Sequence, residues 1–122
     1  MKKVVLATVL SLSAVSANAA TPTQIGEALL CAGSYQHMSN LAAAGGLNEE
    51  SANFTEAKNV LGIWSFRQLT SMGLDSTVSS AFVTTHIQKG DNLAREQLSD
   101  GSSIETIHQI CTPSLTRAYA SR

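Results

Sequence analysis

The sequence predicts an all-α protein, a small up-down bundle of four helices stapled by one disulfide between the first and last helices. No stretch alternates apolar and polar residues over a useful length, which is the pattern expected of a half-buried strand. Proline occurs only at positions 22 and 113, where a helix can begin, and glycines separate the segments of helical periodicity. The only two cysteines fall in the first and last predicted helices.

The first 19 residues have the three parts of a Sec-type signal peptide. Met1 is followed by two lysines, residues 4–15 are largely apolar, and Ala17-Asn18-Ala19 is a small-x-small triplet that a signal peptidase accepts. The apolar run is shorter than the roughly 20 residues that a spanning helix needs. We therefore expect cleavage near Ala19, a periplasmic or secreted location, and a single helical domain at residues 20–122 without a membrane span.

Cys31 and Cys111 are predicted to form a structural disulfide, because export places them in an oxidising compartment. In the loop-entropy model, a bridge that closes most of the chain contributes about 4–5 kcal/mol, against a total stability of roughly 5–15 kcal/mol for a small domain. A redox site would show Cys-x-x-Cys, and a thiolate metal site needs further ligands close by. The sequence has neither pattern.

The first predicted helix, residues 22 to about 44, is apolar on nearly all sides, which is typical of a buried central helix. Thr21 is its expected cap, and Gly26 and Gly33 would allow a neighbouring helix to approach closely. The second predicted helix has Asn48 as its cap and runs to about residue 72. Its predicted core face comprises Phe54, Ala57, Leu61, Trp64 and Met72.

The third predicted helix begins at a cap provided by Asp75 or Ser76 and reaches about residue 98. Asp91 and Arg95 form an expected i, i+4 pair on its polar side. Its predicted core face comprises Phe82, Val83, Ile87, Leu93, Ala94 and Leu98. The short connections between successive helices favour antiparallel neighbours.

The fourth predicted helix opens with the capping-box pattern Ser102-x-x-Glu105, and Pro113 is expected to stop or kink it. Its predicted core residues are Ile104, Ile107, Ile110 and Cys111. In an up-down arrangement this helix returns beside the first one, as the disulfide requires.

Four titratable side chains are weak candidates for a functional site: His37, His86, His108 and Glu27. His86 is either a ligand or pH-responsive group, or simply a core histidine with one hydrogen-bond partner. His37 and His108 would be able to face each other if the first and fourth helices are neighbours. Glu27 also suits a first-turn acid that complements the helix dipole. The histidine spacing fits no metal site, and we expect no metal and no cofactor.

The sequence patterns do not predict an enzyme or a nucleic-acid-binding protein. Nucleophile motifs, paired carboxylates, a glycine-rich phosphate loop and a haem-attachment motif are absent from the sequence. The chain has eight basic and nine acidic residues, and two of the lysines belong to the signal peptide. The remaining domain therefore has no basic surface of the kind that binds nucleic acid.

Ile63 and Phe66 are large apolar residues that lie opposite the core stripe of the second helix. Either another helix covers them, or they form part of a surface that contacts another protein or a second copy of the chain. With catalytic motifs absent, we expect a small exported protein that acts by protein–protein binding.

The overall plan is similar to that of several periplasmic immunity and inhibitor families: a signal peptide, a small helical bundle, and one cysteine in each of the first and last helices. This likeness implies binding to a periplasmic hydrolase or toxin, but no family motif is matched and no residue roles are carried over. Two alternatives stay open. One is a periplasmic stress chaperone, for which 14% charged residues is a low value. The other is a carrier that holds a small ligand or a metal between its helices.

Overall fold

The structure, a computed structural model, describes residues 19–121. This part of the chain folds into four α-helices and contains no strand: α2 (Pro22–Ala44), α3 (Asn48–Ser71), α4 (Ser76–Ser99) and α5 (Ile104–Ala120). A disulfide between Cys31 and Cys111 joins α2 to α5. The predicted fold class, a four-helix bundle stapled between its first and last helices, is confirmed.

Residues 1–18 of the predicted signal peptide lie outside the described residues. Among the helices at residues 22–120, none combines the length and the apolar composition of a membrane span.

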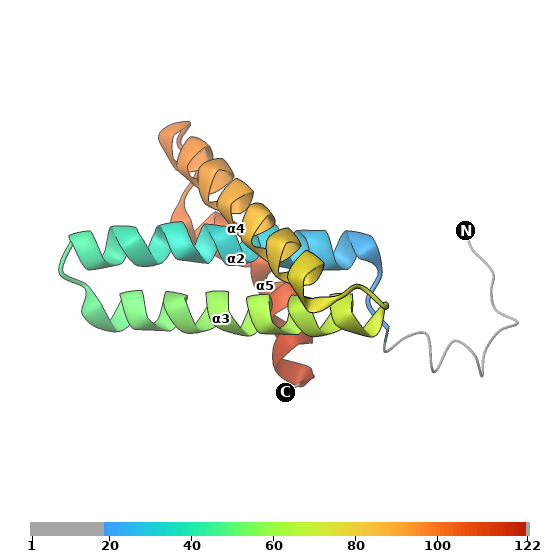
Figure 1. Ribbon diagram of the computed structural model, residues 1–122. Helices are drawn as coiled ribbons and strands as arrows, with labels where there is room; N and C mark the ends of the chain where they lie inside the picture. Colours follow the sequence, from blue (N-terminus) through green and yellow to red (C-terminus); the bar gives the residue numbers. More distant parts are fainter. Residues whose placement is uncertain (1–18, 122) are drawn as a thin grey trace, which may run out of the picture.

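The helices are arranged as an antiparallel pair, α2 and α3, which α4 and α5 cross obliquely (Figure 1). α2 packs against each of the other three helices, and α3 also touches α4 and α5. By contrast, α4 and α5 have few contacts with each other, although only residues 100–103 separate them. α2 is therefore the element that holds the bundle together.

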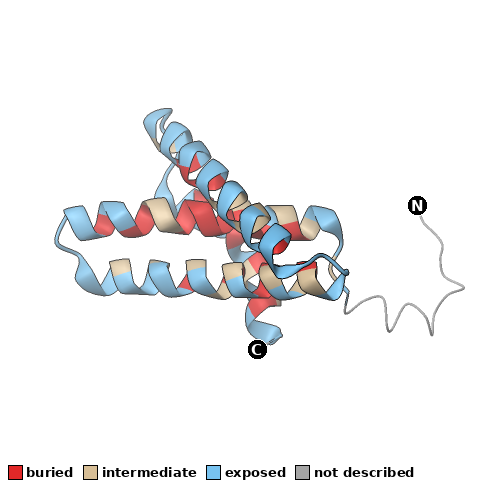
Figure 2. Ribbon diagram, viewed as in Figure 1, coloured by how far each residue is buried: buried red, intermediate tan, exposed pale blue. Residues whose placement is uncertain are grey.

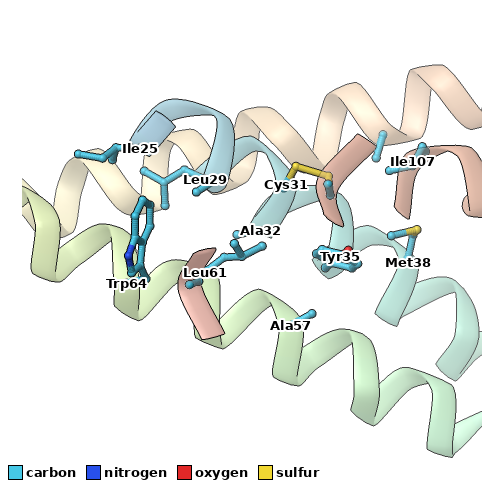
Figure 3. Packing of buried hydrophobic residues seen from close by; sticks show 14 of the residues in the cluster. Ile25, Leu29, Cys31, Ala32, Tyr35, Met38, Ala57, Leu61, Trp64 and Ile107 are labelled. Atoms are coloured by element: carbon cyan, nitrogen blue, oxygen red, sulfur yellow. A yellow bond between two sulfur atoms is a disulfide. The ribbon is translucent and has the colours of Figure 1, made fainter. Parts of the chain in front are cut away.

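The core is built around α2, as its apolar composition predicts. Figure 2 shows buried residues along most of this helix, whereas those of α3 and α4 lie mainly where these helices cover α2. In Figure 3, Leu29, Ala32 and Tyr35 of α2 lie across from Leu61 and Trp64 of α3. The single tryptophan, Trp64, is 5% exposed, so its predicted place in the core is confirmed.

The α2 and α4 backbones touch where Gly33 meets Gly90. A Cβ atom added to either glycine would lie closer than 3.0 Å to backbone atoms of the other helix. Only a residue without a side chain allows this approach. Ala94, one turn after Gly90 in α4, is completely buried. The expectation of a close helix approach is therefore correct for Gly33. Gly26 has no such neighbour, because nothing lies within 4 Å of a Cβ built there.

The helix boundaries agree with the predicted ones to within a few residues, but two caps are corrected. α3 starts at Asn48, so its N-cap is Leu47, which makes no side-chain cap. The N-cap of α5 is Ser103, whose hydroxyl accepts a hydrogen bond from the Thr106 backbone, rather than Ser102. The capping box forms instead at α2, between Thr21 and Gln24.

Pro113 lies inside α5 and does not stop it. The caps expected at Thr21 and Asp75 are present, since the Asp75 carboxylate accepts a hydrogen bond from the Val78 backbone.

Four residues predicted to be core are corrected by the structure: Met72, Leu93, Ile104 and Ile110 are 52%, 40%, 39% and 66% exposed. Met72 is the C-cap residue that follows α3. The other three belong to α4 and α5, which diverge instead of packing along their lengths. The sequence finds the apolar side of each helix correctly, but the crossing geometry leaves part of it uncovered.

Candidate functional site

Ile63 lies at a groove between α3 and α5, with 52% of its surface exposed. The groove has a volume of about 670 Å³. Its apolar lining includes Val60, Trp64 and Ala118, and its polar lining includes Asn59, Arg67, Gln68 and Ser121. We call this surface the α3–α5 groove.

Phe66 occupies a different surface from Ile63. It is partly buried and borders a shallow depression against the first turns of α4, where its neighbours are mostly hydroxyl-bearing residues such as Ser80 and Thr84. The two residues predicted to form one interface thus point toward different helices, Ile63 toward α5 and Phe66 toward α4. Of the pair, Ile63 is the one that is accessible.

A second groove opens between α2, α4 and α5, directly over the disulfide. Its volume is about 420 Å³, and we call it the disulfide groove. Its buried lining residues come from three helices: Cys31, Ser34, Gly90, Ile107, Cys111 and Ser114. Its larger apolar lining residues are Leu30, Leu93, Ile107, Ile110 and Pro113, and its charged ones are Glu27 and Arg117.

The disulfide groove exists because two neighbouring residues of α2 hold two different helices. Cys31 holds α5 through the disulfide, and Gly33 holds α4 through the backbone contact with Gly90. Away from these points α4 and α5 have little contact with each other, so a wedge of space stays open between them. The exposed side chains of Leu93 and Ile110, predicted as core, line this wedge.

Asp91 is the one buried charged side chain among the described residues, at 3% exposure, although its helix position predicted a solvated face. Its carboxylate accepts a hydrogen bond from Gln36 of α2 at 2.8 Å and from Arg95 at 3.1 Å. His37 Nδ1 lies 3.5 Å from the same carboxylate. The predicted Asp91–Arg95 pair is confirmed, and the cluster fastens α4 to α2 beside the glycine contact.

His108 pairs with Tyr35, so the two histidines that the sequence placed near each other have different partners. The Tyr35 hydroxyl oxygen lies 2.7 Å from His108 Nδ1, and the two rings meet edge to face. Tyr35 is 1% exposed. Burial, with a smaller contribution from Tyr119, raises the pKa of Tyr35 to about 12, because a buried phenolate loses its hydration.

His86 has the single backbone partner expected of a structural histidine. Its Nδ1 donates to the carbonyl of Phe82 at 2.9 Å, and its ring stacks on the Phe82 ring. In the part of the chain that the structure describes, no three histidine, cysteine or acidic side chains are grouped so as to hold a metal ion. Of the four weak candidates, Glu27 borders the disulfide groove.

Comparisons with protein-family models, with curated proteins and with solved structures found no match to this chain.

Sequence reasoning missed Arg117, Leu30 and the open side of α4 and α5 as parts of a possible site. No sequence pattern predicted that Leu93 and Ile110 would be exposed, because both lie at core positions of their helical periods. The cysteines did give information on helix crossing, because a disulfide between the first and last helices fixes where α5 must cross α2.

Proposed function

We propose that the protein acts by binding another protein through the α3–α5 groove, with Ile63 at the centre of the contact. The exposure of Ile63 is the observation that carries this proposal. This aliphatic side chain is 52% exposed in the middle of a helix, while Leu61, two residues earlier, is completely buried. Single exposed aliphatic residues are common on protein surfaces, but Ile63 also lies at the edge of a groove, and this combination supports a contact surface.

The residues around Ile63 have the composition of a protein interface. The partly buried Val60 adds apolar surface beside it, and Asn59 and Arg67 supply polar groups at the margin. Interfaces typically combine an apolar centre with a polar rim, and a few central side chains carry most of the binding energy. The groove is also held in place by the disulfide, which lowers the ordering cost of binding.

The partner class that we propose is a hydrolase or toxin of the same compartment, with this protein as its inhibitor or immunity protein. The support is the plan of the chain: a predicted signal peptide and a small helical domain with one disulfide. A second copy of the chain is the other partner to be tested.

The test is site-specific photo-crosslinking in the organism that makes the protein. A photoreactive amino acid replaces Arg67, which borders the α3–α5 groove, and in a control chain it replaces Glu96, an exposed residue of α4. We expect an adduct of defined mass from position 67 alone. Adding Ile63→Ser should abolish it, since loss of a central anchor typically costs 2 kcal/mol or more, roughly thirtyfold in affinity.

Leu61→Ser is the matched control for folding. We expect Ile63→Ser to change stability by no more than about 0.5 kcal/mol, as is usual for an exposed position, while Leu61→Ser should cost several kcal/mol. If positions 67 and 96 give the same adducts, or if Ile63→Ser leaves the adduct unchanged, the α3–α5 groove is not the binding surface. An adduct of twice the chain mass would identify self-association.

A further inference from the structure

We propose that the disulfide groove is a second site, which binds a small amphiphile: a medium-length alkyl chain that ends in a carboxylate. This site is separate from the α3–α5 groove, and it does not depend on the protein-binding role proposed above.

The disulfide groove is a fixed feature of the fold. Its α5 side is held by the covalent bond at Cys31, and its α4 side by the backbone contact at Gly33, two residues further along α2. The buried Asp91 cluster adds a third attachment of α4 to α2. A groove with such attachments exists before any ligand arrives, as is usual for small-molecule sites.

The walls of the groove match an alkyl chain. Leu93 of α4 and Ile110 of α5 are 40% and 66% exposed, and the partly buried Leu30 adds apolar surface nearer the disulfide. A chain lying in the groove would cover apolar surface on both walls that nothing in the described chain covers. The volume of about 420 Å³ falls in the lower half of the range for small-molecule sites.

Arg117 supplies the charge that selects a carboxylate. Its side chain borders the groove and is partly buried, and among the described residues it has no ion-pair partner. A guanidinium that has lost part of its hydration gains most from an anion, and its planar donor fork fits a carboxylate. A neutral alkyl ligand would leave this charge without a partner.

Glu27 borders the same groove and has the opposite effect on an anion. It is exposed, so it keeps its hydration and needs no ligand to satisfy it. Its negative charge weakens the binding of a carboxylate only modestly, because water screens exposed charges. The two residues therefore give effects of opposite sign, which a purely hydrophobic site would not show.

The probes are hexanoate, octanoate and decanoate, with octan-1-ol as the neutral analogue. Each is titrated into isotopically labelled protein with its disulfide intact, and the affected residues are mapped by nuclear magnetic resonance. We expect the shifts to centre on Leu30, Leu93 and Ile110. Each added methylene should tighten binding by up to about fourfold, and octanoate should bind more tightly than octan-1-ol.

Three variants separate the contributions. Arg117→Gln should weaken octanoate binding about tenfold or more and leave octan-1-ol within twofold, since a charge-assisted hydrogen bond is lost. Glu27→Gln should tighten octanoate about twofold. Lys89→Gln removes a charge from an exposed position of α4 outside the groove, and it should change neither.

Equal binding of octanoate and octan-1-ol, or an unchanged octanoate affinity in Arg117→Gln, would overturn the carboxylate assignment. Shifts that map to the α3–α5 groove, or no saturable shifts with any probe, would overturn the site itself. The absence of saturable shifts is also the result expected if side chains of a partner protein, and not an amphiphile, fill the disulfide groove.

Discussion

Gly33→Ala is the substitution that tests most directly how the bundle is held together. It adds one methyl group to the centre of α2, and the new Cβ would lie less than 3.0 Å from three atoms of α4: the Ile87 carbonyl oxygen, the Asp91 nitrogen and the Gly90 carbonyl carbon. All three are backbone atoms, so no side-chain rotation relieves the clash. The two helices must separate by more than an ångström to reach ordinary contact distances.

The expected loss of stability follows from two opposing effects. Overpacking of this kind costs about 1–3 kcal/mol, and a contact between backbones belongs at the upper end of that range. Alanine recovers about 1 kcal/mol through its higher helix propensity. The net loss for Gly33→Ala is therefore about 2 kcal/mol. In a domain of this size that corresponds to a fall in melting temperature of roughly 10 °C.

Gly26→Ala provides the matched control, because the same chemical change in the same helix meets nothing within 4 Å. It should gain about 1 kcal/mol from helix propensity alone. Urea and thermal unfolding followed by far-UV circular dichroism measure both variants. If Gly33→Ala is as stable as Gly26→Ala, the backbone contact between α2 and α4 does not hold the helices as described.

Two further predictions concern buried side chains of α2, namely Tyr35 and the disulfide-bonded Cys31. Stability should fall as the pH rises from 10 toward 12, because Tyr35 ionises near pH 10 when unfolded but has a pKa of about 12 when folded. Tyr35→Phe should remove this fall, whereas Tyr119→Phe, at an exposed position, should leave most of it; chemical unfolding across this pH range checks both. Replacing Cys31 and Cys111 together by serine should lower the melting temperature by tens of degrees, since the loop-closure contribution is about 4–5 kcal/mol. A shift of only a few degrees in calorimetry would contradict that estimate.

The sequence predicts the helices well because local signals set them, and it predicts the disulfide because the chain has only two cysteines. Thr21 and Asp75 are caps, Gly73 and Gly101 follow helix ends with positive φ, and the all-round apolar surface of α2 marks it as central. These features depend on residues within a turn or two of each other.

The sequence predicts the candidate sites poorly because they depend on how helices cross. Periodicity gives the apolar side of α4 and α5, yet it contains no information on the angle at which each leaves α2. Leu93 and Ile110 are therefore exposed although helical periodicity predicts them to be core, and Asp91 is buried although periodicity places it on the solvated face. Gln36 reaches that carboxylate where α2 meets α4 through Gly33 and Gly90, which are 57 positions apart in the sequence.

The central place of α2 also matters for how the chain is made. Synthesis starts at the N-terminus, so the helix that the finished fold covers on most sides is produced before α3, α4 and α5 exist to cover it. Its cysteine stays an unpaired thiol until residue 111 follows, 80 positions later. An unfinished chain therefore presents both an uncovered apolar helix and a reactive sulfur. We expect such chains to need a holding chaperone, and chains that end before α5 to be degraded or cross-linked to the wrong partner.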